Sequence, residues 1–111
     1  MSITTRAAVL SRSGAALPYA DSRPLSLETV TLDPPGPGEV RVAVKAAGLC
    51  HSDLSVINGD RPRPMPMALG HEAVATVLEP GSIAAKHFAP GDRVVLSFLP
   101  LCGYCPSCHS G

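Results

Sequence analysis

The clearest pattern in the chain is the alternation of apolar and polar residues in the segment 39–46. Val40, Val42, Val44 and Ala46 occupy every second position. A period of two places all four side chains on one face of an extended backbone. The segment therefore predicts a β-strand with one apolar face.

Four further apolar stretches of strand length, each followed by turn-forming residues, lie at 7–10, 25–32, 73–78 and 93–98. One short helix is predicted over 52–58, with Ser52 as its N-terminal cap and Gly59 as its end. Proline-rich segments at 33–38 and 61–66 exclude helix and central strand and predict exposed loops. Short strands, proline turns and one helix together predict a mainly β fold, a small irregular β-barrel.

The composition fits a single domain and limits the classes of partner that the protein is expected to bind. The chain has 111 residues, including 12 prolines and no tryptophan, so Val, Leu, Ile and Ala must fill a modest core. Nine basic residues balance nine acidic ones without a basic run, which gives no support to a nucleic-acid partner. No apolar stretch approaches the ~20 residues that span a bilayer, so no membrane partner is expected. Residues 1–14 lack the amphipathic spacing of a transit peptide, and a cytoplasmic location is expected.

Three cysteines recur at every third position near the end of the chain: Cys102, Cys105 and Cys108. Three thiolates on one tight loop suit a tetrahedral ion, with His109 or a residue beyond 111 as the fourth ligand. The chain's four cysteines also allow two disulfides, in three pairings, but the close spacing and the absence of a signal peptide favour metal. An inert buried cluster is a poorer explanation, because thiols this close are rarely mere packing. The spacing alone leaves zinc and an iron–sulfur cluster both open.

A second group of metal-ligating residues lies in two separate segments. Cys50, Ser52 and Asp53 follow the clearest strand, and His71 with Glu72 precedes the next one. A thiolate and an imidazole supply two of the three protein ligands that a catalytic zinc requires. The two carboxylates can orient the ligand imidazole. Taken alone, Cys50 also fits a buried thiol and His71 a core histidine.

Four motifs carry a resemblance to a known family. The segments 48–53 (GLCHSD), 68–72 (ALGHE), 90–95 (PGDRVV) and 102–108 (CGYCPSC) resemble, in order and spacing, the zinc-dependent medium-chain alcohol dehydrogenases. The resemblance runs from Arg6 through nearly the whole chain. It implies that residues 1–111 are the N-terminal portion of a GroES-like catalytic domain, whose cysteine-rich zinc lobe begins near residue 100.

The resemblance also implies roles for the first group of residues. Cys50 and His71 correspond to ligands of the catalytic zinc, with Glu72 counted in the same metal set. Asp53 stands beside them as a carboxylate that supports the ligands. Ser52 corresponds to the hydroxyl that takes the proton of the alcohol, a task suited to a group that both donates and accepts.

Other positions acquire expected roles in the same way. His51 stands where the family places a residue near the cofactor pyrophosphate, and Phe98 corresponds to an aromatic wall of the substrate pocket. The cysteines of the 102–108 segment correspond to three of the four ligands of a structural zinc, with the fourth expected near position 116. The resemblance therefore favours zinc over iron–sulfur.

The sequence departs from the family pattern in the proton relay. Ser55 occupies the position of the histidine that ends the relay in many members, so His51, or water and the cofactor ribose, would have to replace it. No Gly-x-Gly-x-x-Gly motif is present, and the α/β nucleotide-binding domain of the family is absent from these residues. That domain would need on the order of 150 further residues. The third ligand of the catalytic zinc is also expected outside residues 1–111.

These observations define the expected function. The resemblance implies an oxidoreductase that transfers hydride from a zinc-bound primary or secondary alcohol to NAD or NADP, with catalytic and structural zinc. Its partners would be small alcohols or aldehydes and further copies of itself, while the 111-residue chain alone is expected to be inactive. The alternatives are a stand-alone, metal-stapled β-barrel binding module without catalysis and a small iron–sulfur carrier.

Overall fold

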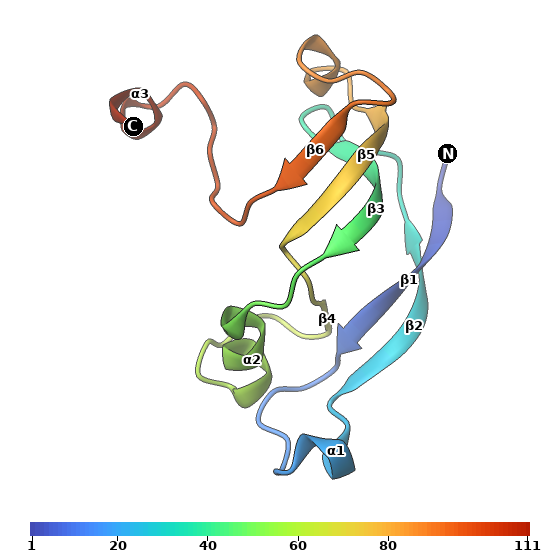
Figure 1. The fold of residues 1–111 in the computed structure, drawn as a ribbon, viewed down its shortest axis with the longest axis vertical. Coiled ribbons are helices and arrows are strands. Elements are labelled where there is room, and N and C mark those ends of the chain that lie inside the picture. The colour runs from blue at the N-terminus through green and yellow to red at the C-terminus, as the bar shows by residue number, and fades with distance from the viewer.

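The computed structural model describes residues 1–111 as two open, three-stranded antiparallel sheets (Figure 1). The first sheet has the order β2-β1-β4, with β1 at Ile3–Leu10, β2 at Leu25–Leu32 and β4 at Met67–Ala68. The second has the order β3-β5-β6, with β3 at Val40–Ala47, β5 at Ala73–Pro80 and β6 at Arg93–Leu96. The mainly β prediction is confirmed.

Four short helical segments accompany the sheets: α1 at Tyr19–Ser22, α2 at His51–Asn58, the 3₁₀ turn η1 at Ala84–Lys86 and α3 at Pro106–Ser110. Only α2 is predicted from the sequence. An irregular arm connects β6 to α3 and carries the C-terminal cysteines away from both sheets (Figure 1). No helix in the structure has both the length and the apolar character needed to cross a bilayer.

Helix α2 ends as predicted but begins differently. Gly59 adopts a positive φ of 91° and closes the helix through its N–H to the carbonyl of Val56. The prediction that Ser52 caps the helix is wrong, because Cys50 occupies the cap position in extended conformation. Ser52 lies in the first turn instead, where its hydroxyl is free for partners outside the helix.

A cluster of buried apolar side chains lies where β1 meets α2. Leu10 is fully buried, and Val56 and Ile57 of α2 pack with it. Four partly buried apolar side chains surround this cluster: Tyr19, Met65, Met67 and Leu69. This small core therefore fixes α2, and with it the residues at its N-terminus, against the first sheet and the proline-rich loop.

The strand predicted over 39–46 is β3, whose neighbour is β5. The pairing is interrupted between Arg41 and Val42 and again between Val44 and Ala46. The apolar face of β3 is incompletely covered, since Val44 is 58% exposed. On the same face, Ala75 and Val77 of β5, which pair with Val44 and Val42, are buried.

Candidate metal centre

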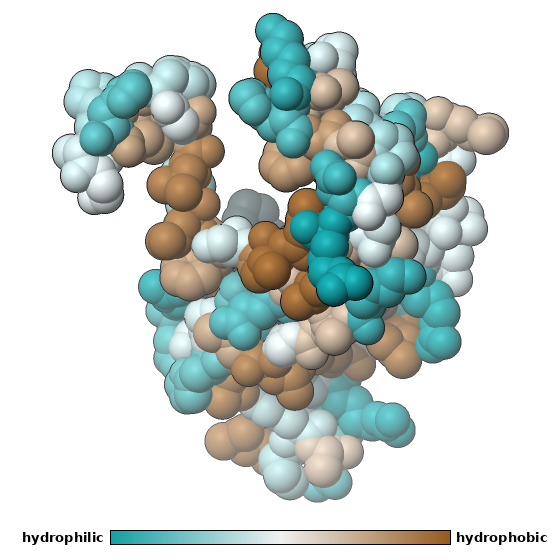
Figure 2. Space-filling model, turned by 45° about the horizontal axis from the view of Figure 1, so that its top comes forward, coloured by the Kyte–Doolittle hydropathy of each residue, from teal (hydrophilic) through white to brown (hydrophobic).

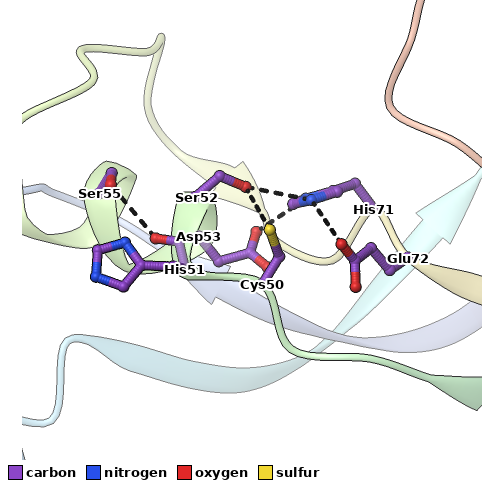
Figure 3. A network of polar contacts seen from close by, with 7 residues as sticks. All are labelled: Cys50, His51, Ser52, Asp53, Ser55, His71 and Glu72. Carbon is purple, nitrogen blue, oxygen red and sulfur yellow. Dashed lines mark hydrogen bonds and ion pairs between the residues drawn. The ribbon is translucent and has the colours of Figure 1, made fainter.

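The fold brings together one thiol, one imidazole and one carboxylate from distant parts of the sequence (Figure 3). Cys50 lies between β3 and α2, whereas His71 and Glu72 precede β5. The pairing of β3 with β5 places these two segments at the same end of the second sheet, with Ala47 opposite Ala73. The candidate ligand atoms of Cys50, His71 and Glu72 all lie within 4.8 Å of one another.

Both nitrogens of His71 have a neighbour. Asp53 Oδ1 lies 3.2 Å from Nδ1, and the Ser52 hydroxyl lies 3.2 Å from Nε2 and donates to Cys50 Sγ at the same distance. A carboxylate beside Nδ1 favours the imidazole proton on that nitrogen, so Nε2 is the nitrogen whose lone pair can bind a metal. This is the tautomer that a metal ligand requires.

Glu72 approaches this group through a gap left by a glycine. Its Oε1 lies 3.9 Å from His71 Nε2, and its backbone carbonyl accepts the N–H of Gly48 at 2.9 Å. A Cβ at Gly48 would lie only 2.9 Å from Glu72 Oε2. Gly48 thus provides the space for the carboxylate, a contact that nothing in the local sequence reveals, because it depends on strand pairing.

A cavity of about 490 Å³ opens beside these residues. Nine residues line it: Cys50, Ser52, Asp53, Val56, Arg61, Arg63, Met67, His71 and Phe98. The ring of Phe98 meets that of His71 edge to face, with centroids 5.7 Å apart and an interplanar angle of 77°. Arg61 and Arg63 belong to the segment that the sequence marks only as a proline-rich loop.

His51 and Ser55 lie apart from this network. The ring of His51 points away from Cys50 and His71, and its backbone carbonyl accepts a hydrogen bond from the Ser55 hydroxyl at 3.3 Å (Figure 3). His51 is exposed at the start of α2. Neither residue therefore completes a proton path from Ser52 within the described contacts.

The C-terminal cysteines form a separate group on and before α3. Cys108 Sγ lies 3.4 Å from Cys105 Sγ and 3.8 Å from Cys102 Sγ, and all four cysteines of the chain are free thiols. Hydrogen bonds from the backbone of Tyr104 and then of Cys105 lower the pKa of Cys102 to about 7. The pKa of Cys108 is also lowered, chiefly by a backbone hydrogen bond from Gly103. Three neighbouring thiols, two of them with a lowered pKa, fit a tetrahedral thiolate site. His109 is not one of the grouped ligands.

The profile of the alcohol dehydrogenase GroES-like domain matches residues 36–111. The chain belongs to the alcohol dehydrogenase GroES-like domain family. Alcohol dehydrogenase B of Mycobacterium tuberculosis (strain H37Rv) is 42% identical over 97 residues, which make up 86% of this chain and 26% of that protein. The family resemblance and the GroES-like fold expected from the sequence are confirmed.

Solved structures of dehydrogenases share this family fold. An alcohol dehydrogenase zinc-binding domain protein from Burkholderia ambifaria superposes with a TM-score of 0.85 and 38% identity, covering 99% of this chain and 27% of that one. A cobalt- and zinc-bound thermostable alcohol dehydrogenase from Pyrobaculum aerophilum superposes with a TM-score of 0.80 and 34% identity, covering 98% and 31%. The chain thus spans about a quarter to a third of the length of these relatives.

Proposed function

We propose that these residues form the N-terminal portion of a zinc-dependent alcohol dehydrogenase, which transfers hydride from a primary or secondary alcohol to NAD or NADP. The observation that carries the proposal is the meeting of Cys50, His71 and Glu72 within 4.8 Å, in a chain of the alcohol dehydrogenase GroES-like family. The alcohol loses a hydride to the nicotinamide ring and a proton from its hydroxyl, so the substrate is oxidised by two electrons to an aldehyde or ketone.

The donor set fits zinc. Thiolate and imidazole are the nitrogen and sulfur ligands that zinc prefers, and the Asp53–His71 contact provides the supporting carboxylate common beside such ligands. Zinc supplies Lewis acidity, which lowers the pKa of a hydroxyl that it contacts. The metal-stabilised C-terminal lobe is proposed to use Cys102, Cys105 and Cys108, with a fourth ligand near position 116.

Ser52 is the group best placed to receive the alcohol proton. Its hydroxyl lines the cavity and lies 3.2 Å from both Cys50 Sγ and His71 Nε2. A hydroxyl can accept one proton while passing on another. The proton path beyond Ser52 would run through water or the cofactor, because the imidazole ring of His51 points away from the Ser52 hydroxyl (Figure 3). His51, exposed at the start of α2, is proposed to contact the cofactor pyrophosphate.

The test uses the full-length protein and measures reduction of NAD and NADP by simple alcohols, together with zinc content. Cys50→Ala and His71→Ala should each abolish turnover and remove one zinc per chain. His87→Ala is the matched control, since His87 is exposed at the end of η1 and lines no part of the cavity. Unchanged turnover in His71→Ala would overturn the proposal.

The same measurements separate the alternative of a metal-stapled binding module. Such a module would retain bound zinc but would show neither nucleotide affinity nor alcohol-dependent reduction of NAD or NADP. A coloured preparation that contains iron would instead indicate the iron–sulfur alternative, because zinc is a colourless d¹⁰ ion.

A further inference from the structure

Two arginines give the cavity beside Cys50 and His71 an excess of positive charge. Of the nine lining residues, only Asp53, Arg61 and Arg63 carry a formal charge at neutral pH when histidine is neutral. Asp53 is engaged with His71 at 3.2 Å. The wall therefore presents two cations and no free anion.

Neither guanidinium has an acidic partner. The ion pairs of the structure involve Arg41 with Glu79 and His71 with its two carboxylates, and no other residue. Between them, Arg61 and Arg63 make one side-chain hydrogen bond, a long contact of 3.4 Å from Arg63 Nη1 to the carbonyl of Pro62. Both guanidinium groups are consequently free to bind an anion. A guanidinium group can donate two parallel hydrogen bonds to the oxygens of a carboxylate or a phosphate.

The backbone of the loop holds the two arginines at the cavity. The N–H of Arg61 donates to the carbonyl of Ser55 in α2 at 3.1 Å, which ties the loop to the helix that carries Ser52. Pro62 and Pro64 flank Arg63 and fix their own φ angles. Cationic side chains anchored in this way lose less entropy on binding than they would on a free loop.

The rest of the wall is suited to a short carbon chain. Val56, Met67 and Phe98 provide apolar surface in the same cavity of about 490 Å³ that Cys50, His71 and the two arginines line. We propose that Arg61 and Arg63 determine substrate specificity, and that the substrate is an alcohol or aldehyde with a carboxylate at the far end of a short aliphatic chain. This inference rests on the proposed dehydrogenase function and adds the substrate class to it.

The test compares two matched alcohols, 6-hydroxyhexanoate and 1-hexanol, in the full-length protein. The wild type should show the higher kcat/KM for the hydroxy acid, and this preference should decline with added salt. Arg61→Gln and Arg63→Gln should each lower kcat/KM for the hydroxy acid about 5-fold, and the double variant about 20-fold, because exposed charge contacts are individually modest. Values for 1-hexanol should stay within about twofold of wild type.

Two further variants serve as controls. Arg12→Gln removes an exposed arginine that does not line the cavity, and should leave both substrates unchanged. Arg63→Lys keeps the positive charge but loses the planar guanidinium group, and should retain part of the preference for 6-hydroxyhexanoate over 1-hexanol. A merely structural role for the loop would instead lower kcat/KM for both alcohols together.

Three results would overturn the inference. The first two are equal kcat/KM for the two alcohols in the wild type and equal losses of kcat/KM for both alcohols in the glutamine variants. The third is a higher KM for NAD or NADP in the glutamine variants, whichever alcohol is used. The last result would assign the arginines to a cofactor phosphate. If neither alcohol is oxidised, the proposed function fails, and calorimetric titration of 6-hydroxyhexanoate decides the inference separately. Binding that weakens in the double variant supports the anion site, and unchanged binding refutes it.

Discussion

The carboxylate of Asp53 should strengthen metal binding by His71, and the size of this effect can be measured. Asp53→Asn retains the size of the side chain but removes the negative charge 3.2 Å from Nδ1. The proton on Nδ1 is then less strongly favoured, so zinc affinity at this site should fall about 10- to 100-fold. Competition with a chelator in the full-length protein measures the change. Asp60→Asn, at an exposed acid outside the cavity, should leave the affinity unaltered.

Gly48 tests whether the position of Glu72 matters. Gly48→Ala would place a Cβ 2.9 Å from Glu72 Oε2, and the flexible carboxylate can move away at little cost to folding. The free energy of unfolding should change by less than about 1 kcal/mol, whereas kcat/KM for alcohols should fall in the full-length protein. Gly38→Ala is the control, because no atom lies within 4 Å of its added Cβ. Equal kinetics in the two variants would show that Glu72 has no part in the site.

The lowered pKa of Cys102 predicts how the metal-free chain reacts with iodoacetamide. The backbone N–H groups of Tyr104 and Cys105 stabilise the thiolate and lower the pKa to about 7, from an ordinary value of 9.0. Because the thiolate is the reactive form, alkylation of Cys102 should rise steeply as pH increases through 7 and level off above it. Mass spectrometry of peptides after timed labelling gives the pH profile. A midpoint near 9 would contradict the geometry of the loop.

Sequence motifs predict which residues meet at the candidate metal centre, but they do not predict all the contacts that position those residues. Cys50, His71 and Glu72 stand out because thiol, imidazole and carboxylate recur at a fixed order and spacing, and the structure brings all three together. The contact of Gly48 with Glu72 could not be predicted, since it depends on the pairing of β3 with β5. The sequence prediction of Ser52 as the cap is wrong by two residues, because Cys50 occupies the cap position and the helix begins at His51.

At the scale of elements, local patterns predicted the long strands and missed the short pieces. The strand expected over 25–32 coincides with β2, whose eight residues pair along their whole length with β1. Strand β4 has two residues within a proline-rich region and exists only through its pairing with Val9 and Leu10. Elements of this kind have no periodicity of their own, so only tertiary contacts can define them.

Leu10 of β1 packs against helix α2, so truncating its side chain should destabilise the contact between the strand and the helix. The side chain is fully buried against Val56 and Ile57, so Leu10→Ala should lower the free energy of unfolding by about 2–4 kcal/mol. Leu27→Ala, at a side chain that is 70% exposed, should cost less than about 0.5 kcal/mol. Urea unfolding of the dilute chain measures both. Similar losses in the two variants would mean that the β1–α2 cluster is not the principal core.

The molecule as a whole is more open than its length requires. Its radius of gyration is 16.1 Å, whereas a compact domain of this size has about 13 Å. Figure 2 shows apolar surface exposed along the arm that leads to α3, where Phe98, Leu99 and Leu101 are each more than half exposed. Both sheets also end in unpaired edge strands. An exposed apolar surface next to an open edge favours association.

The 111-residue chain by itself should therefore self-associate as its concentration rises, and β6 is the edge where this tendency can be tested. Val95 is 78% exposed on β6, so Val95→Lys adds a charge to an open edge and should shift the equilibrium toward monomer. Leu17→Lys makes the same chemical change at a side chain that is 77% exposed but lies outside both sheets, and should have a much smaller effect. Sedimentation velocity over a wide concentration range distinguishes the two variants. A wild-type chain that stays monomeric throughout would show that its open edges are protected by features other than charge.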